Sequence, residues 1–273
     1  MSSIKTLLAE LNIFPSKTLG QNFLVHPQVA EKIVDFANIP KNVPVLEIGP
    51  GLGAMTRLLL NRGNVLAIEK DERLYLYLKT LFNEEARLTL LHLDALVVDY
   101  QSILTHPPYF VCANLPYSIS TPLLDRLLLN ISLFDPGMTF LLQKELVDRI
   151  HAQPGSKSYG SLSVYVQTLC EAIGGPTISA NSFHPVPDVG SKLIKLMPRK
   201  KPLIPKSQQA EFFNFVRQLF QYRRKSIKRS LGHIFENDRI SQIDTIEPLY
   251  LKSRVEALSI SDIFKLFQSI SNK

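Results

Sequence analysis

Short apolar runs rich in β-branched residues alternate with helical patterns through the first 200 residues of the chain. The runs that predict strands are VPVLEIG (43–49), NVLAIEK (64–70), RLTLLHLD (87–94) and PYFVCANLP (108–116). The segments with helical periodicity are PQVAEKIVDFAN (27–38), AMTRLLLNR (54–62), DERLYLYLKTLF (71–82) and STPLLDRLLLNI (120–131). MTFLLQKELVDRI (138–150) predicts a strand that runs directly into a helix. This alternation favours a parallel sheet with helices on both faces.

The pattern changes toward the C-terminus. EAIGGPTI (171–178) and VGSKLIKLM (189–197) predict two strands that close the sheet. A segment rich in proline and basic residues (197–209) is typical of a linker, and helical patterns alone follow from about residue 210. We therefore predict an α/β domain over residues 1–198 and a small all-helical domain over residues 199–273.

The composition is that of a globular protein. Of the 273 residues, 45% are hydrophobic and 20% are charged, which excludes a disordered or collagen-like chain. No run approaches the roughly 18 apolar residues that a membrane helix needs, and the N-terminus lacks the apolar core of a signal peptide. Cys112 and Cys170 lie in apolar runs, so we expect both in the core and the protein in the reducing cytoplasm.

The positive charge is concentrated in one stretch. The formal net charge is +7, and residues 199–232 carry ten Lys and Arg residues against one acid, Glu211. A solvated helix face would interleave acids with bases, so this surplus favours contact with a nucleic acid. The basic side chains that we expect to meet phosphates are Arg217, Arg223, Arg224, Lys225 and Lys228. On a single helix through this stretch, the residues that share a buried face are Val216, Phe220, Ile227 and Leu231.

A glycine-rich loop, EIGPGLGA (47–54), follows the first strand and opens a helix. It matches the G-x-G-x-x-A pattern of dinucleotide-binding folds, and Glu69, 20 residues after Gly49, can accept hydrogen bonds from ribose hydroxyls. Together they indicate an adenosine-bearing cofactor without saying which one. Pro50 removes one backbone donor from the loop, which mildly favours a cofactor that has no pyrophosphate.

Four residues end the first four predicted strands: Gly49, Glu69, Asp94 and Asn114. Because ligands of such sheets lie beyond the carboxyl ends of the strands, we expect all four in one crevice. Asp94 can accept a hydrogen bond from an adenine amino group, which suits S-adenosylmethionine, although Asp94 alone could equally cap a helix.

The tetrapeptide Asn114-Leu115-Pro116-Tyr117 is the most specific chemical signal. Methylation of an exocyclic adenine amine needs two neutral acceptors that hold its hydrogens. The side-chain oxygen of Asn114 can be one acceptor, and the carbonyl of Leu115, held extended by the following proline, can be the other. Tyr117 offers an aromatic face on which an extruded base can stack.

With these motifs the chain resembles the ribosomal RNA adenine N6-methyltransferases, and within them the bacterial small-subunit dimethyladenosine transferases. The resemblance covers nearly the whole chain through LGQNFL (19–24), VLEIGPGLGAMT (45–56), IEKDERL (68–74), LDAL (93–96), ANLPYSIS (113–120), YGSLSV (159–164), FHPVPDVGSKLIKL (183–196) and the basic FQYRRKSIKRSL (220–231). It implies a Rossmann-like S-adenosylmethionine-dependent methyltransferase domain with a seven-stranded sheet, followed by a helical RNA-binding domain.

The resemblance also implies roles for particular residues. The cofactor contacts that it implies fall on Asn22, Leu24, Gly49, Glu69, Asp94 and Asn114. Phe183 is implied as the second aromatic wall of the target-base pocket, opposite Tyr117, and His184 departs from the small polar residue expected beside it. No metal is expected. The implied reaction places four methyl groups on two neighbouring adenosines in the 3′-terminal hairpin loop of 16S rRNA, within a small-subunit particle, by a monomeric enzyme that contacts no membrane.

Three alternatives stay open at this point. A large-subunit rRNA adenine methyltransferase of the antibiotic-resistance type would share every catalytic motif. A nicotinamide-dependent oxidoreductase would share only the glycine loop, which would leave the tetrapeptide and the basic stretch without a purpose. A non-catalytic rRNA-binding assembly factor would be expected to have lost Glu69 or the tetrapeptide, and both are present.

Overall fold

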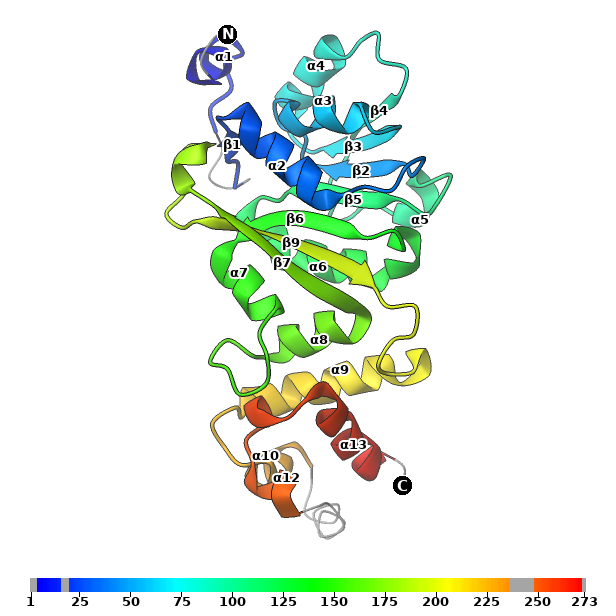
Figure 1. Ribbon diagram of the computed structural model, residues 1–273, viewed down its shortest axis with the longest axis vertical. Coiled ribbons are helices and arrows are strands. Elements are labelled where there is room, and N and C mark those ends of the chain that lie inside the picture. Colours follow the sequence, from blue (N-terminus) through cyan, green and yellow to red (C-terminus); the bar gives the residue numbers. More distant parts are fainter. Residues whose placement is uncertain (1–3, 16–19, 236–247, 272–273) are drawn as a thin grey trace. The chain divides into compact units, whose positions relative to one another are not determined.

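The computed structural model describes residues 4–15, 20–235 and 248–271. A seven-stranded sheet dominates the N-terminal part, and its strand order is β4-β3-β2-β5-β6-β9-β7 (Figure 1). The strands are β2 (Val45–Ile48), β3 (Val65–Glu69), β4 (Leu88–His92), β5 (Phe110–Asn114), β6 (Met138–Gln143), β7 (Cys170–Ile178) and β9 (Ser191–Pro198). The pairs from β4 to β6 are parallel, and β9 pairs antiparallel with β6. The predicted sheet and its seven strands are confirmed.

Helices cover both faces of this sheet, as the alternating pattern predicts. Figure 1 shows α2 in front of the sheet and α6 behind it. The helices of this part are α1 (Ile4–Glu10), α2 (Pro27–Ala37), α3 (Ala54–Leu60), α4 (Glu72–Leu81), α5 (Tyr100–Ile103), α6 (Ser120–Leu129) and α7 (Lys144–Ile150). Ile33 of α2 and Leu59 of α3 pack with Val45, Val65 and Cys112 of the strands in one buried cluster. Strands β2, β3, β5 and β6 are buried along almost their whole length, so each face of the sheet supplies part of the core.

A separate two-stranded sheet pairs distant parts of the chain. It consists of β1 (Phe23–Leu24) and β8 (Phe183–His184), in antiparallel register with Leu24 opposite Phe183. Neither strand is evident from periodicity, because two residues are too short to show an alternation.

The remaining elements are helical: α8 (Ser161–Leu169), α9 (Lys206–Gln221), α10 (Ile227–Ile234), α12 (Pro248–Lys252) and α13 (Ile260–Ser271). Phe212, Phe215 and Leu219 of α9 form a core with Ile263 and Phe267 of α13. Within the described ranges, none of the helices has both the length and the apolar character needed to cross a bilayer.

The chain folds into two compact units whose boundaries differ from the single break expected after residue 198. The first unit comprises residues 1–147 and 173–198, and the second comprises residues 148–172 and 199–273. The segment 148–172 belongs to the second unit because Tyr159 and Val164 are buried in the same core as Phe212 of α9. Helix α8 of this segment continues the strand–helix alternation in sequence, so the pattern alone placed the segment in the α/β domain.

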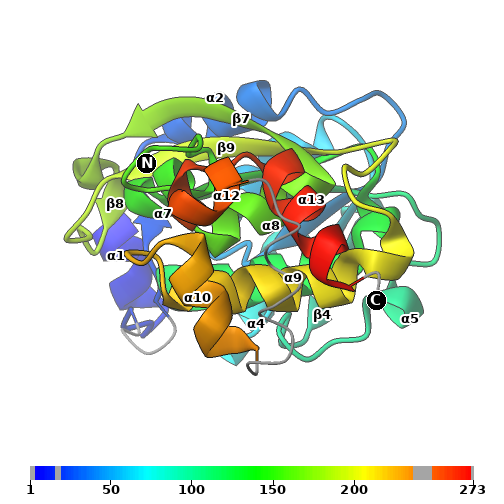
Figure 2. The same cartoon turned by 90° about the horizontal axis from the view of Figure 1, so that it is seen from below.

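The expectation of one helix through residues 216–231 is wrong. Helix α9 ends at Gln221 and α10 begins at Ile227, and Figure 2 shows them as two separate helices. Val216, Ile227 and Leu231 are nevertheless buried in one core. Val216 belongs to α9 and the other two residues belong to α10, so their burial in one core does not require a single continuous helix.

Candidate active site

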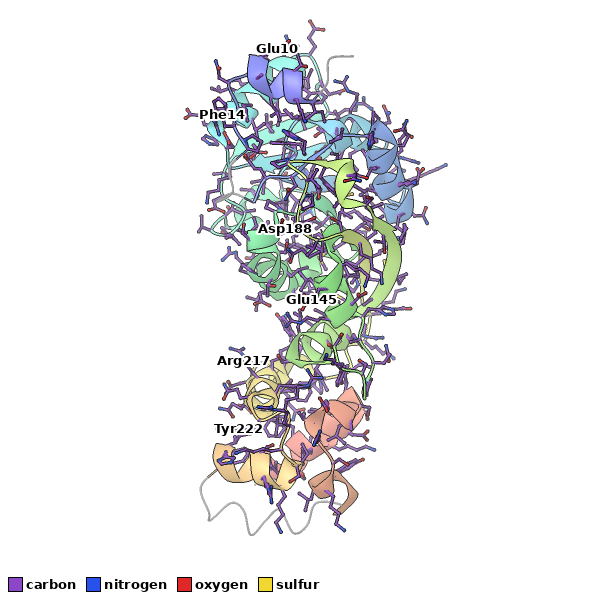
Figure 3. The ribbon with its side chains drawn as sticks, turned by 90° about the vertical axis from the view of Figure 1, so that its left-hand side faces the viewer. Glu10, Phe14, Glu145, Asp188, Arg217 and Tyr222 are labelled. Carbon is purple, nitrogen blue, oxygen red and sulfur yellow. The ribbon has the colours of Figure 1, made fainter. Side chains whose placement is uncertain are left out.

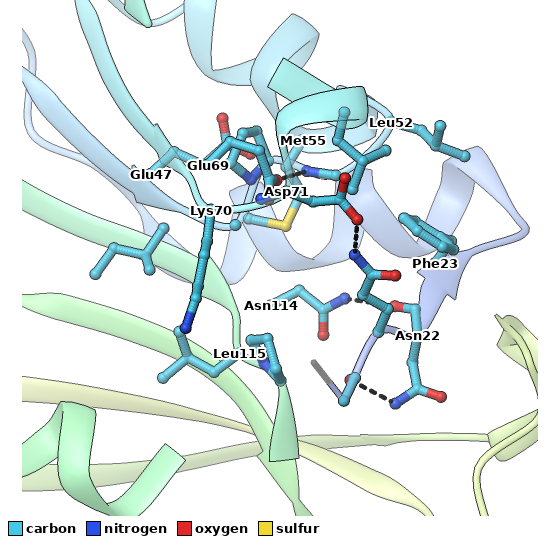
Figure 4. Close-up of a pocket in the computed structure, with 18 of the residues that line it drawn as sticks. Asn22, Phe23, Glu47, Leu52, Met55, Glu69, Lys70, Asp71, Asn114 and Leu115 are labelled. Atoms are coloured by element: carbon cyan, nitrogen blue, oxygen red, sulfur yellow. Dashed lines mark hydrogen bonds between the residues drawn. The ribbon is translucent and has the colours of Figure 1, made fainter. Parts of the chain in front are cut away.

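A cavity of about 290 Å³ lies at the carboxyl ends of β2, β3 and β5. Figure 4 shows Asn22, Glu69 and Asn114 around it. All six residues expected to bind the cofactor line it: Asn22, Leu24, Gly49, Glu69, Asp94 and Asn114. Leu115, Pro116 and Tyr117 line the same cavity. Parallel strands bring Gly49, Glu69, Asp94 and Asn114 together, because their carboxyl ends meet at one edge of the sheet, whereas Asn22 and Leu24 reach the cavity from the N-terminal segment.

The glycine loop forms a close backbone wall of the cavity. Gly49, Gly51 and Gly53 all have positive φ values, of 69°, 60° and 80°. A side chain at any of them would be strained. A Cβ atom built on Gly49 would have no atom within 4 Å other than those of its chain neighbours, so the backbone of this residue is open to close approach by a ligand.

Glu69 holds the loop and the following turn in place. Its carboxylate accepts hydrogen bonds from the backbone N–H of Gly51 at 3.1 Å and of Asp71 at 2.9 Å. The side chain is only 6% exposed, and burial raises the pKa of this carboxyl above its ordinary value. The backbone N–H of Lys70 is a third donor to this carboxylate. A carboxylate has about four lone-pair sites, so the group can still accept from a ligand hydroxyl.

Asp94 combines the two roles considered for it. Its carboxylate accepts a hydrogen bond from the backbone N–H of Leu96 at 2.9 Å, as a capping residue does. It also forms an ion pair of 2.7 Å with the ammonium group of Lys70. Partial burial would raise the pKa of Asp94, but the bonds from Lys70 and Leu96 outweigh it and lower that pKa. Asp94 is therefore an anionic acceptor at the cavity edge.

Asn114 is anchored by a contact to the N-terminal segment. Its Nδ2 donates a hydrogen bond to the backbone carbonyl of Asn22 at 3.2 Å. The side chain of Asn22 in turn donates to the carbonyl of Gly20 at 3.1 Å. The tetrapeptide continues from β5 into a short 3-10 turn. The phenol hydroxyl of Tyr117 lies 2.6 Å from the hydroxyl of Ser191.

Phe183 lies apart from the cavity lining. Its side chain is 1% exposed and belongs to the buried cluster under α2 and α3. In this conformation the ring presents no open face to a base, whereas Tyr117 is half-buried and lines the cavity. The expected role of Phe183 as an aromatic wall stays a prediction. His184, the departure from the family pattern, follows it in β8 and pairs with Phe23.

Two acidic residues of the cavity were not singled out from the sequence. Glu47 of β2 is 1% exposed, and its Oε2 atom has no hydrogen-bond partner among the described residues. Burial raises the pKa of Glu47 to about 8, so it is largely protonated at neutral pH. Asp71 accepts from Gln21 at 3.0 Å and pairs with Arg73 at 2.8 Å. The sequence held one signal for Glu47: it is the only acid within the apolar strand VLEI (45–48), and a buried acid is unusual.

The basic residues of the helical unit divide into two kinds. Four side chains, those of Arg217, Arg224, Lys225 and Lys228, are exposed, and Figure 3 labels Arg217 on α9. Arg223 differs, because its guanidinium pairs with Glu256 at 2.5 Å and donates to the carbonyl of Lys157 at 2.6 Å. It ties the turn after α9 to two other segments of the same unit. The described ranges contain no group of three or more His, Cys, Asp or Glu side chains that could hold a metal ion.

Comparisons with known proteins show the family of the chain. The family model described as ribosomal RNA adenine dimethylase matches residues 15–272. A protein named ribosomal RNA small subunit methyltransferase A from Clostridium botulinum is 39% identical over 259 residues, which cover 93% of this chain and 94% of that protein. A protein of the same name from a Geobacillus species is 36% identical over 267 residues, which cover 94% of this chain and 90% of that protein.

Solved structures show the same fold. A dimethyladenosine transferase from Plasmodium falciparum superposes with a TM-score of 0.79 and 26% identity, over 92% of this chain and 98% of its own. The 23S rRNA methyltransferase ErmE gives a TM-score of 0.70 at 24% identity, over 91% and 99% of the two chains. At that identity the second likeness supports the fold alone. With its cavity, its tetrapeptide and a family match over nearly its whole length, the chain belongs to the ribosomal RNA adenine dimethylase family.

Proposed function

We propose that the protein transfers methyl groups from S-adenosylmethionine to the N6 atoms of two neighbouring adenosines in the 3′-terminal hairpin loop of 16S rRNA. The observation that carries the proposal is the convergence of the tetrapeptide with Gly49, Glu69 and Asp94 on one cavity. The relatives named small subunit methyltransferase A, which match over almost the whole chain, support the choice of ribosomal subunit.

The cavity fits an adenosine-bearing sulfonium compound. The open backbone at Gly49 allows close approach, and the carboxylates of Glu69 and Asp94 accept hydrogen bonds from ribose hydroxyls and an adenine amino group. Asn22 and Leu24 complete the wall. When bound, S-adenosylmethionine supplies an electrophilic methyl group. Because burial raises the pKa of Glu47 to about 8, this acid adds little negative charge to the site, which limits the stabilisation of a cation that must lose its charge in the reaction.

The tetrapeptide holds the target amine. Because Nδ2 of Asn114 is bonded to the carbonyl of Asn22, its Oδ1 atom is the acceptor that remains for a hydrogen of the adenine N6 group. The carbonyl of Leu115 accepts a hydrogen bond from the second hydrogen, and the nitrogen can then direct its lone pair at the methyl group. The extra proton that N6 carries after the transfer is released to water. Tyr117 stacks on the extruded base. No strong base is needed at this step, so positioning accounts for most of the rate.

The exposed bases of α9, α10 and the turn between them contact rRNA phosphates in this proposal. Arg217, Arg224, Lys225 and Lys228 are exposed, whereas Arg223 is committed to Glu256 and supports the turn that carries its neighbours. We propose that the substrate is rRNA within a small-subunit particle in the cytoplasm, and that the enzyme acts as a monomer and without a metal.

Labelled S-adenosylmethionine and ribosomal subunits that lack the modification test this proposal. Small and large subunits are incubated separately with the protein, and the modified bases are mapped. We expect label in dimethyladenosine at two adjacent positions near the 3′ end of 16S rRNA. Label in 23S rRNA alone would support the antibiotic-resistance type instead, and tight rRNA binding without label would support an assembly factor.

A further inference from the structure

The phenol of Tyr117 is tied to a strand 74 residues away. Its hydroxyl lies 2.6 Å from the hydroxyl of Ser191, a normal length for a hydrogen bond between two hydroxyls. Ser191 is the first residue of β9 and is 0% exposed. Burial raises the pKa of Tyr117, so its phenol stays protonated at neutral pH and can take either side of this bond.

The sheet makes Ser191 a fixed anchor. Strand β6 lies between β5, which ends at Asn114, and β9. Ser191 is opposite Gln143 at the end of β6, and the N–H of Lys144 donates to the carbonyl of Gly190 at 2.9 Å. The Tyr117 side chain therefore spans the carboxyl end of β6, and its hydroxyl is bonded to the first residue of β9, an interior strand of the sheet, rather than to a loop.

The near end of the tyrosine is also restrained. The carbonyl of Pro116 accepts hydrogen bonds from the N–H of Ile119 at 3.2 Å and from the hydroxyl of Ser120 at 3.0 Å. With the backbone held on one side and the hydroxyl on the other, rotation about the Cα–Cβ bond of Tyr117 would carry its hydroxyl away from Ser191 and break the bond. The direction of the side chain, and with it the place of the ring in the cavity, is thus set by the pair.

We propose that Ser191 is a positioning residue for the target adenine: its hydroxyl fixes the place of the Tyr117 ring in the cavity, and the ring face rather than the phenol group recognises the base. This inference rests on the proposed stacking role of Tyr117. It accounts for a serine in the FHPVPDVGSKLIKL segment (183–196), where the neighbouring strand residues are apolar or basic. It also predicts that no hydrogen bond from the phenol reads the base.

The test compares Ser191→Ala, Tyr117→Phe and the double variant in steady-state methyl transfer. We expect each single variant to lower kcat/KM for RNA by roughly 3- to 10-fold, the effect of one neutral hydrogen bond, and to leave the KM for the cofactor unchanged. Because both changes remove one bond, the double variant should be no worse than either single variant. Ser191→Ala should also weaken the quenching of 2-aminopurine placed at the first target position in the RNA.

Thr139→Val serves as the matched control. Thr139 lies on the adjacent strand β6, is equally buried, and its hydroxyl has no hydrogen-bond partner among the described residues. It should behave as the wild type. Tyr117→Phe reports on the same bond from the loop side if Ser191→Ala folds poorly. Unchanged kcat/KM and quenching in Ser191→Ala, or losses that multiply in the double variant, would overturn the inference.

The wild type separates this inference from the proposed function. A wild-type protein that methylates no rRNA contradicts both. An active wild type with a neutral Ser191→Ala contradicts the inference alone.

Discussion

The side-chain amide of Asn114 donates a hydrogen bond of 3.2 Å to the backbone carbonyl of Asn22, across 92 residues of sequence. This bond sets which end of the amide faces the cavity. The Nδ2 group is occupied, so Oδ1 is presented as a neutral acceptor. The N-terminal segment therefore takes part in orienting the side chain of Asn114, besides lining the cavity.

We expect Asn114→Ala to lower kcat by roughly 100-fold or more, the size seen when one transition-state hydrogen-bond partner is lost, while the Kd for S-adenosylmethionine changes little. Asn114→Asp should also fail, because an ionised carboxylate beside the base is costly. Single-turnover methyl transfer and calorimetric cofactor titration measure the two quantities. Near-normal turnover in either variant would contradict the two-acceptor arrangement.

Asp94→Ala should weaken cofactor binding by roughly 10-fold or more, since a hydrogen bond to a charged acceptor is lost, with a smaller effect on kcat. Asp99→Ala is the matched control. Asp99 caps α5 by accepting from the N–H of Gln101 at 3.0 Å, as Asp94 accepts from Leu96 at 2.9 Å, but it does not line the cavity. Equal losses of cofactor affinity in the two variants would mean that Asp94 acts only as a cap.

The buried carboxyl of Glu47 should make stability depend on pH. Its pKa is raised from 4.5 to about 8 in the folded protein, so between these values the folded state binds more protons than the unfolded state. The contribution of Glu47 to the free energy of unfolding is therefore greatest below pH 4.5 and falls as the pH rises toward 8, by up to ~1.4 kcal/mol per pH unit. Glu47→Gln removes this dependence.

Urea unfolding of the wild type and Glu47→Gln at several pH values between 5 and 8 measures this effect. The difference in stability between the two proteins should shift in favour of Glu47→Gln as the pH rises. Parallel curves over this range would show that the carboxyl of Glu47 titrates near its ordinary value.

Replacing Arg224 and Lys228 together by Ala should weaken rRNA binding and reduce the slope of log K against log salt by about one to two units. Cofactor affinity should not change. Lys41→Ala with Arg87→Ala is the control of equal charge, since these residues precede β2 and β4, at the edge of the sheet opposite the cavity. If both double variants keep the wild-type salt slope and remain folded, the basic stretch serves solubility rather than RNA contact.

Arg223 should behave differently from its neighbours. Its guanidinium is bonded to Glu256 and to the carbonyl of Lys157, so Arg223→Ala is expected to lower the thermal stability of the protein. Glu256→Ala should lower it by a comparable amount, because it breaks the same pair. A change in RNA affinity without a change in melting temperature would instead assign Arg223 to the RNA interface.

The sequence by itself determined the strands, the glycine loop and the order of residues at the strand ends. These features are local: a short apolar run marks each central strand, and a glycine or a polar residue follows where the run stops. The transition inside MTFLLQKELVDRI, for example, is visible because the apolar run ends at Gln143, and α7 begins at Lys144. Parallel pairing then brings Gly49, Glu69, Asp94 and Asn114 to one edge without further information.

Only the tertiary structure decided which distant groups meet. The bonds of Asn114 to Asn22, Tyr117 to Ser191 and Arg223 to Glu256 join residues 33 to 92 positions apart. The same holds for the place of residues 148–172 among the C-terminal helices, the break between α9 and α10, and the burial of Phe183. Periodicity indicates which face of a helix or strand is buried. It does not indicate which other element covers that face, because any apolar surface of suitable shape satisfies the same pattern.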